Sequence, residues 1–135
     1  MAIRSAAHRG VDVRLLVPIR DDSRLVAAAV RSYYDEWLAC GARVFEYRPA
    51  MLHAKTMLVD RELAVVGSAN FDNRSFRLNF EILAAVYDPT VADQLAAGFE
   101  EDLLRSREVH PHRLTRRSYP RYLSEVGARL FSALL

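Results

Sequence analysis

The chain has 135 residues, of which 51% are hydrophobic and 27% charged, and its formal net charge at pH 7 is +2. This length and composition are typical of one globular domain and exclude a second domain of ordinary size. No stretch approaches the roughly 18 consecutive apolar residues of a membrane span, and the N-terminal residues lack the apolar core of a signal peptide. The single Cys40 excludes an internal disulfide. We therefore expect one soluble or peripheral domain.

Apolar periodicity, interrupted by Gly, Pro and capping residues, predicts helices and strands along the whole chain. In chain order, the expected elements are a helix end over 2–9, a strand over 11–17, a helix over 23–39, strands over 43–47, 52–60, 63–67 and 79–87, and helices over 90–107 and 120–134. The short turn after residue 60 predicts an antiparallel hairpin, and Asp88 with Pro89 predicts the start of the next helix. This order predicts an α/β fold, a mixed β-sheet flanked by helices.

The residues with evident chemistry are concentrated between 51 and 81. His53 and Lys55 are two positions apart, so on a strand both side chains leave the same face. A neutral imidazole is nucleophilic near physiological pH and can form a covalent intermediate, whereas an ammonium supplies a fixed charge for phosphate oxygens. Of the nineteen basic residues, Lys55 is the only lysine. The pair therefore indicates chemistry on a phosphoryl group.

The second strand of the hairpin leads into Gly67-Ser68-Ala69-Asn70. These small and polar residues are suited to place a hydroxyl, an amide and backbone N–H groups beside the same phosphate. A tight turn satisfied by Ser68 and Asn70 is the less favoured alternative. Glu81 stands in an otherwise apolar stretch, where an unpaired carboxylate would be costly, so we expect it to have a partner.

These residues also carry a family resemblance. His-x-Lys-x4-Asp followed by Gly-Ser-x-Asn resembles the signature of the phospholipase D superfamily, and Asn-Phe-Asp-Asn-Arg-Ser-Phe-Arg-Leu-Asn-Phe-Glu resembles its bacterial cardiolipin synthase branch. The likeness covers nearly the whole chain, but only as the C-terminal part of such an enzyme, because the family has two His-x-Lys motifs and this chain has one. We therefore expect residues 1–135 to form a single phospholipase D-like half-domain, with 108–135 as a basic C-terminal helical extension.

The resemblance implies a set of site residues: His53, Lys55, Asp60 and Glu81 as catalytic, and Ser68, Asn70 and Arg74 as phosphate-binding. It implies that His53 is the phosphohistidine nucleophile or the general acid, and that Glu81 accepts the Nδ1 proton of a catalytic imidazole. Asp60 is equally an ordinary turn residue, and Arg74 is equally a surface charge. No residues have the spacing of a metal site, and the implied chemistry requires no metal or other cofactor.

The resemblance implies a phosphatidyltransferase of the cardiolipin synthase type, acting on a phosphatidylglycerol-like phospholipid from the cytoplasmic side of a bacterial membrane. A nuclease or hydrolytic phospholipase would use the same groups, because the motif reads a phosphodiester and not the alcohol. The missing second motif implies a partner half-domain or a homodimer. It also leaves open that this chain alone is an inert half-site.

The C-terminal part of the chain is basic. Residues 105–129 contain seven Arg and two Glu, a charge of +5, so the remaining residues carry −3. With the apolar spacing of Leu123, Val126, Leu130 and Leu134, this pattern predicts a helix that contacts an anionic membrane. A helix that packs its apolar face on the rest of the protein is the alternative. Nucleic-acid binding is a third use of basic residues, which we do not expect because only Tyr119 and Tyr122 lie among the arginines.

Overall fold

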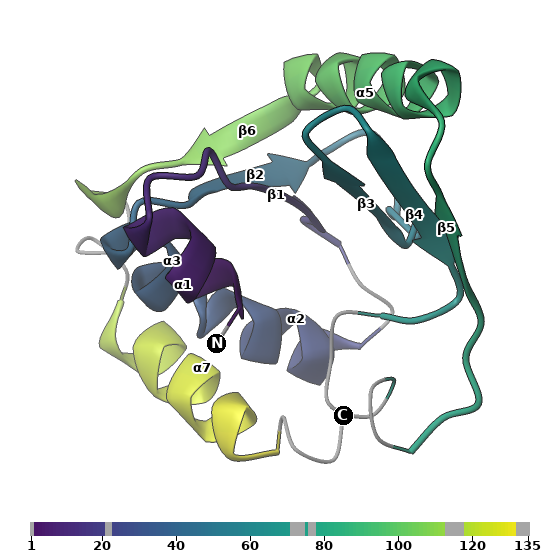
Figure 1. Ribbon diagram of the computed structural model, residues 1–135. Helices are drawn as coiled ribbons and strands as arrows, with labels where there is room; N and C mark the ends of the chain where they lie inside the picture. The colour runs from purple at the N-terminus through teal and green to yellow at the C-terminus, as the bar shows by residue number, and fades with distance from the viewer. Residues whose placement is uncertain (1, 21–22, 71–74, 76–77, 113–117, 132–135) are drawn as a thin grey trace.

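The computed structural model describes residues 2–20, 23–70, 75, 78–112 and 118–131, and only the backbone of residues 121 and 129–131. Helices alternate with strands as expected for an α/β fold (Figure 1). The elements are α1 (Ala2–His8), β1 (Arg14–Pro18), α2 (Arg24–Arg31), α3 (Tyr34–Ala39), β2 (Arg43–Tyr47), β3 (Thr56–Val59), β4 (Leu63–Gly67), β5 (Leu83–Val86), α5 (Pro89–Leu104), β6 (Ser106–Val109) and α7 (Tyr119–Phe131).

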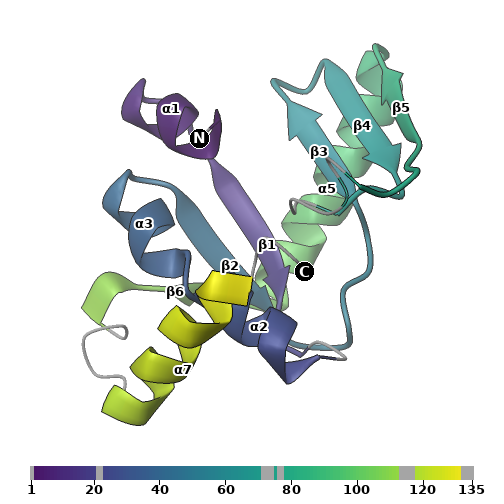
Figure 2. The same cartoon turned by 90° about the horizontal axis from the view of Figure 1, so that it is seen from below.

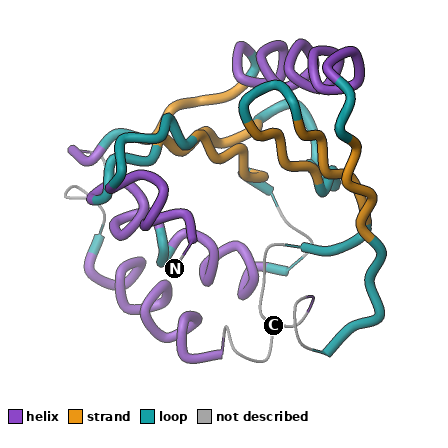
Figure 3. Tube along the Cα trace, in the orientation of Figure 1, coloured by secondary structure: helices purple, strands orange, loops and turns teal. Residues whose placement is uncertain are grey.

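The strands form two three-stranded sheets instead of one. In the first sheet, of order β1-β2-β6, β1 and β2 are parallel and β6 is antiparallel to β2, so this sheet is mixed as predicted. The second sheet, of order β3-β4-β5, is entirely antiparallel. Helix α5 contacts strands of both sheets. Figure 3 shows the strands lying between α5 and the other helices, which gather on the opposite side of the first sheet.

The core forms where α3 packs on the first sheet. Tyr34, Val44 and Val109 are buried together, with Leu15, Val17, Val30, Trp37 and Leu38 packed around them. Burial raises the pKa of the Tyr34 hydroxyl above its ordinary value. A second, smaller cluster joins α2 to α7 through Ala28, Ala29 and Ala128. Figure 2 shows these two helices side by side.

The predicted helix over 23–39 is wrong as one element, because it is divided into α2 and α3 at Ser32 and Tyr33. The Ser32 hydroxyl donates to the carbonyl of Ala29 at 2.6 Å, and a side chain that takes up a helical carbonyl in this way favours a break. The start of α2 is as expected, since Ser23 accepts a hydrogen bond from the Val26 N–H.

The predicted helix over 90–107 ends earlier, at Leu104, and is followed by a strand that we did not expect. At the helix start, Asp88 accepts hydrogen bonds from the N–H groups of Val91 and Thr90, which lower the pKa of its carboxyl. At the other end, the Ser106 hydroxyl donates to the carbonyl of Asp102 at 2.6 Å. Beyond it, Val109 enters the core opposite Val44, so tertiary packing decides the strand.

Candidate active site

His53 and Lys55 lie in the segment that leads into the second sheet. The expected strand over 52–60 begins only at Thr56, so both residues precede β3. Backbone pairing nevertheless reaches Lys55, whose carbonyl accepts the N–H of Gly67 at 3.1 Å. The Lys55 ammonium donates to the carbonyl of His53 at 2.8 Å. This bond holds the ammonium of the half-buried Lys55 against the backbone of the exposed His53.

Ser68 and Glu81 meet where β4 ends and β5 begins. The backbone of Ser68 donates to the Ile82 carbonyl, and the Ile82 N–H donates back to the Ser68 hydroxyl, each at 3.0 Å. The Ser68 hydroxyl donates in turn to Glu81 Oε2 at 2.5 Å. The Asn79 amide donates to Glu81 Oε1 at 3.1 Å. Both carboxylate oxygens of Glu81 are therefore held by donors from this chain.

The electrostatic consequence is a carboxylate that stays ionised. The hydrogen bonds from Ser68 and Asn79 lower the pKa of Glu81, and the Ser75 hydroxyl and the positive charge of Lys55 add to this effect. Lys55 therefore relates His53 to Glu81. Its ammonium donates to the His53 carbonyl, and its positive charge lowers the pKa of the Glu81 carboxyl. These donors differ from the imidazole that the resemblance implied as the partner of Glu81.

A glycine allows this close approach of β4 and β5. Gly67 faces Leu83 in the strand register. A Cβ at residue 67 would collide with the Ile82 carbonyl oxygen and would lie 2.9 Å from the Leu83 Cα. The pairing that brings Ser68 to Glu81 therefore requires a residue without a side chain at this position.

Asp60, another of the expected residues, is placed differently. Asp60 lies in the β3–β4 turn, at the opposite end of β3 from His53, a separation of roughly 20 Å for an extended chain. Asp60 and Arg61 both have left-handed backbone, with φ of 51° and 56°, as in the tightest hairpin turns. This position separates Asp60 from the site and favours its structural role.

The loop after Ser68 contributes a contact that the sequence reasoning did not identify. The buried Ser75 hydroxyl accepts the N–H of Asn70 at 3.1 Å, so Ser75 shapes the backbone beside the site while the Asn70 side chain remains exposed. Nothing in the local pattern singles out this serine. Arg74 lies outside the described residues.

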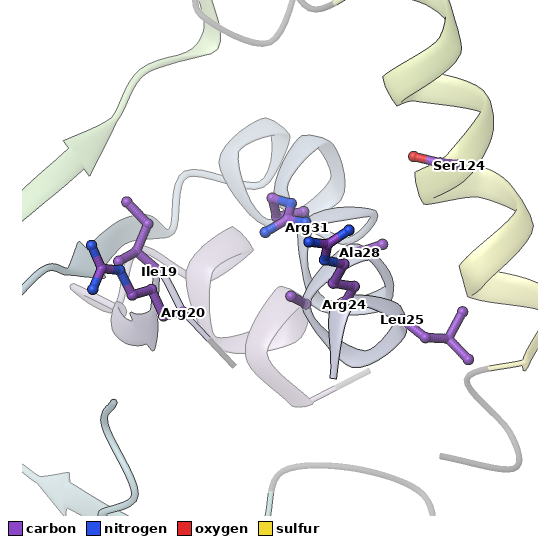
Figure 4. A pocket seen from close by; sticks show the side chains of 8 residues that line it. Ile19, Arg20, Arg24, Leu25, Ala28, Arg31 and Ser124 are labelled. Carbon is purple, nitrogen blue, oxygen red and sulfur yellow. The ribbon is translucent and has the colours of Figure 1, made fainter. Parts of the chain in front are cut away.

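A groove of about 700 Å³ lies elsewhere, between α2 and α7. Figure 4 shows Arg20, Arg24 and Arg31 around it, with Ser124 of α7 on the opposite side. The candidate catalytic residues do not line it. Among the described residues, no group of three or more His, Cys, Asp or Glu side chains is placed to hold a metal ion.

The fold is that of the phospholipase D family. The structure resembles that of a phospholipase D family member, Nuc from Salmonella typhimurium, with a TM-score of 0.68 and 21% identity over 81% of this chain and 71% of that one. The family model described as "Cardiolipin synthase, PLD-like domain" matches residues 1–103. The chain therefore belongs to the cardiolipin synthase, PLD-like domain family, as the motif resemblance predicted.

Curated relatives agree with this assignment. The chain is 44% identical over 134 residues to cardiolipin synthase 2 of Bacillus anthracis, and 49% identical over 137 residues to cardiolipin synthase A of Pseudomonas aeruginosa strain LESB58. In both comparisons 99% of this chain is covered, but only 26% and 27% of the relative. The chain thus spans about a quarter of the proteins that it matches.

Proposed function

We propose that this chain is one catalytic half of a phosphatidyltransferase of the cardiolipin synthase type. The observation that carries the proposal is the connected set of Lys55, Ser68 and Glu81 next to His53, in a chain that belongs to the cardiolipin synthase family. A fixed ammonium is a group that stabilises charge on a five-coordinate phosphorus, and Ser68 holds the Glu81 carboxylate in place beside it.

In the proposed reaction, an imidazole nitrogen attacks the phosphorus of a phosphatidylglycerol-like lipid. A P–N bond forms, the P–O bond to the headgroup breaks, and the alcohol leaves with a proton from a general acid. The hydroxyl of a second phospholipid then attacks the phosphorus and gives its proton to that same group, and the P–N bond breaks. His53 supplies one of the two imidazoles, as nucleophile or as acid. Lys55 neutralises the phosphoryl oxygens, and Asn70 and Arg74 are proposed to contact them.

A second half completes the site in this proposal. Next to the polar groups of Asn79 and Glu81, Leu78, Phe80 and Ile82 are strongly exposed, at 70%, 107% and 77%. Such a continuous apolar row is typical of a surface that is covered in the assembled protein. The chain corresponds to only 26% of the relative from Bacillus anthracis. We propose that the second half covers this apolar row.

We propose that this domain acts at the cytoplasmic face of the bacterial membrane, where its lipid substrate lies. Within the described residues, the longest helices are too short or too polar to cross a bilayer.

The test is lipid turnover by the full-length protein that contains this chain. Vesicles with labelled phosphatidylglycerol should yield cardiolipin and free glycerol, and His53→Ala should abolish both products. Glu62→Gln, at an exposed residue of the β3–β4 turn that has no proposed role in the site, is the matched control and should leave the rate near that of the wild type. Phosphatidic acid without cardiolipin, or DNA cleavage without lipid turnover, would instead identify the hydrolase or the nuclease. Turnover that survives His53→Ala would refute the site.

A further inference from the structure

The groove between α2 and α7 combines three arginines with an apolar floor. Arg24, Ala27, Ala28 and Arg31 of α2 all line it, and they follow the i, i+3, i+4, i+7 spacing of one helical face. Because the two alanines end at Cβ, they leave a hollow between two arginines that lie roughly 10 Å apart along the helix axis. Figure 4 shows the third arginine, Arg20, to one side of this face.

These arginines have hydrogen-bonding capacity that the described chain does not use. Arg20 and Arg24 are exposed, and neither forms a hydrogen bond or an ion pair within the part of the chain that the structure describes. Arg31 Nε lies 3.7 Å from a Glu125 oxygen, beyond hydrogen-bond distance, and this buried nitrogen has no hydrogen-bond partner among the described residues. The Arg31 side chain is still 25% exposed. Since an unpaired buried donor is costly, the groove is suited to an acceptor that enters it.

The lining favours a phosphate that carries an apolar group. The planar fork of a guanidinium matches two phosphate oxygens, so arginine binds phosphate through paired hydrogen bonds. Glu125 is buried against Arg31 and offsets only one of the three charges. Ile19, Leu25 and the alanine floor offer apolar contacts beside these cations, as in ligand sites where a few polar groups orient a largely apolar molecule.

The groove begins at the edge of the first sheet from which the chain also leads to the candidate active site. The Ile19 N–H donates to the Tyr47 carbonyl at 3.1 Å, so the chain leaves the parallel strands β1 and β2 at the same edge. Ligands of open α/β sheets bind at this carboxyl edge. The six residues from Tyr47 to His53 span at most about 22 Å. Neither His53 nor Lys55 lines the groove, so its ligand differs from the one under attack.

We propose that the groove is a second phospholipid site, in which Arg20, Arg24 and Arg31 bind the phosphate and the apolar lining contacts the rest of the lipid. This inference deepens the proposed function and rests on it for the class of ligand. The proposed reaction uses two phospholipids, and Lys55 neutralises the phosphate of only one of them. The groove holds the other, whose hydroxyl attacks the phosphorus.

Calorimetric titration of the 135-residue chain with soluble short-chain lipids tests the site. Dihexanoylphosphatidylglycerol, below its micellar concentration, should bind saturably. Dihexanoylphosphatidylcholine should bind at least about tenfold more weakly, because its choline cation faces the arginines. Inorganic phosphate should also bind more weakly, because it makes no apolar contact. Arg20→Gln/Arg24→Gln should weaken phosphatidylglycerol binding at least about tenfold. Ala27→Leu, which fills the floor without changing the charge, should weaken it as well, and far-UV circular dichroism checks the fold of both variants.

The matched control is Arg9→Gln/Arg61→Gln, which removes the same charge from two exposed arginines outside the groove and should leave lipid binding unchanged. Equal binding by the groove and control variants would overturn the proposal. Inorganic phosphate that binds as tightly as the lipid would assign the groove to a free anion instead. Absence of saturable binding would show that the arginines are neutralised, for example by Asp21 and Asp22, which lie outside the described residues, and would also overturn the proposal.

Turnover by the full-length protein separates this inference from the proposed function. Arg20→Gln/Arg24→Gln should raise KM for phosphatidylglycerol about tenfold with little change in kcat, since it removes binding and not chemistry, whereas His53→Ala should abolish turnover. An unchanged KM would overturn the role of the groove and leave the proposed function standing. Lipid binding in the groove of a protein that makes no cardiolipin would remove the proposed function and leave the lipid site standing.

Discussion

Gly67 offers a direct test of how closely the two strands of the site must approach. In Gly67→Ala the new methyl group would press on the Ile82 carbonyl oxygen and lie 2.7 Å from Cδ2 and 2.9 Å from Cα of Leu83. Two of these three atoms belong to the backbone, so no rotamer change relieves the overlap and β5 must move away from β4. Overpacking of this kind costs about 1–3 kcal/mol. The same movement would pull Glu81 from the Ser68 hydroxyl.

The assay is the thermal unfolding of the 135-residue chain, with Gly98→Ala as the matched control. Gly98 lies within α5, and a Cβ there meets no atom within 4 Å, so alanine should stabilise the chain by roughly 0.5–1 kcal/mol through helix propensity. At roughly 4 °C per kcal/mol for a domain of this size, Gly67→Ala should lower Tm by roughly 4–12 °C, while Gly98→Ala should raise it. A Gly67→Ala protein with unchanged or higher Tm would refute the close approach of β4 and β5.

Three further predictions address the core, the carboxylate and the ammonium. Arg107→Ala should lower the free energy of unfolding by roughly 1–3 kcal/mol, measured by urea denaturation, because it leaves the buried Glu46 carboxylate without its partner; an unchanged midpoint would contradict this. Glu81 has a lowered pKa in the folded chain, so its ionised form contributes stability that is fully present above the ordinary value of 4.5 and is lost as the pH falls through the lower folded value. Glu81→Gln should therefore flatten the stability profile in that acidic range, and parallel profiles would argue against the Ser68 and Asn79 bonds. Lys55→Arg keeps the charge but replaces a compact ammonium with a planar fork, so it should displace the His53 carbonyl and reduce kcat of the full-length protein at least about tenfold; a rate equal to wild type would show that charge alone suffices.

Elements with strong local signals could be predicted from the sequence. Asp88 and Pro89 mark the start of α5 because a capping carboxylate and a fixed proline φ act over a few residues. Strand β2, over Arg43–Tyr47, has the predicted bounds, and the β3–β4 hairpin is as predicted. In each case the residues that decide the element lie within it or next to it.

The elements that were missed depend on partners that are distant in the sequence. Strand β6 has the sequence Ser-Arg-Glu-Val, with no apolar alternation, and becomes a strand because Val109 pairs with Val44 and Arg107 with Glu46 across 61 or more residues. Helix α5 likewise contacts strands of both sheets, which are distant from it or from each other in the sequence. Local periodicity contains no information about either relationship.

In the candidate site too, local features could be predicted and long-range contacts could not. The spacing of His53, Lys55 and Ser68 indicates phosphoryl chemistry because these residue types are informative by themselves. Ser68 and Asn79 could not be identified from the sequence as partners of Glu81, since these contacts depend on how residues 68 and 79 to 82 fold back on each other. The family motif also implied a catalytic role for Asp60. In the structure, strand β3 lies between Asp60 and His53.

The hydrogen bonds within the described site support the proposal that a second half takes part in turnover. Attack on the phosphorus uses a lone pair of one imidazole nitrogen, so the leaving alcohol requires its proton from another group. Glu81 cannot supply it, because its hydrogen bonds and the charge of Lys55 lower its pKa and keep it ionised. The Ser68 hydroxyl proton is directed to Glu81, and the Lys55 ammonium to the His53 carbonyl. In the proposed reaction, the role complementary to that of His53 falls to a group other than these three side chains, and we propose an imidazole of a second half.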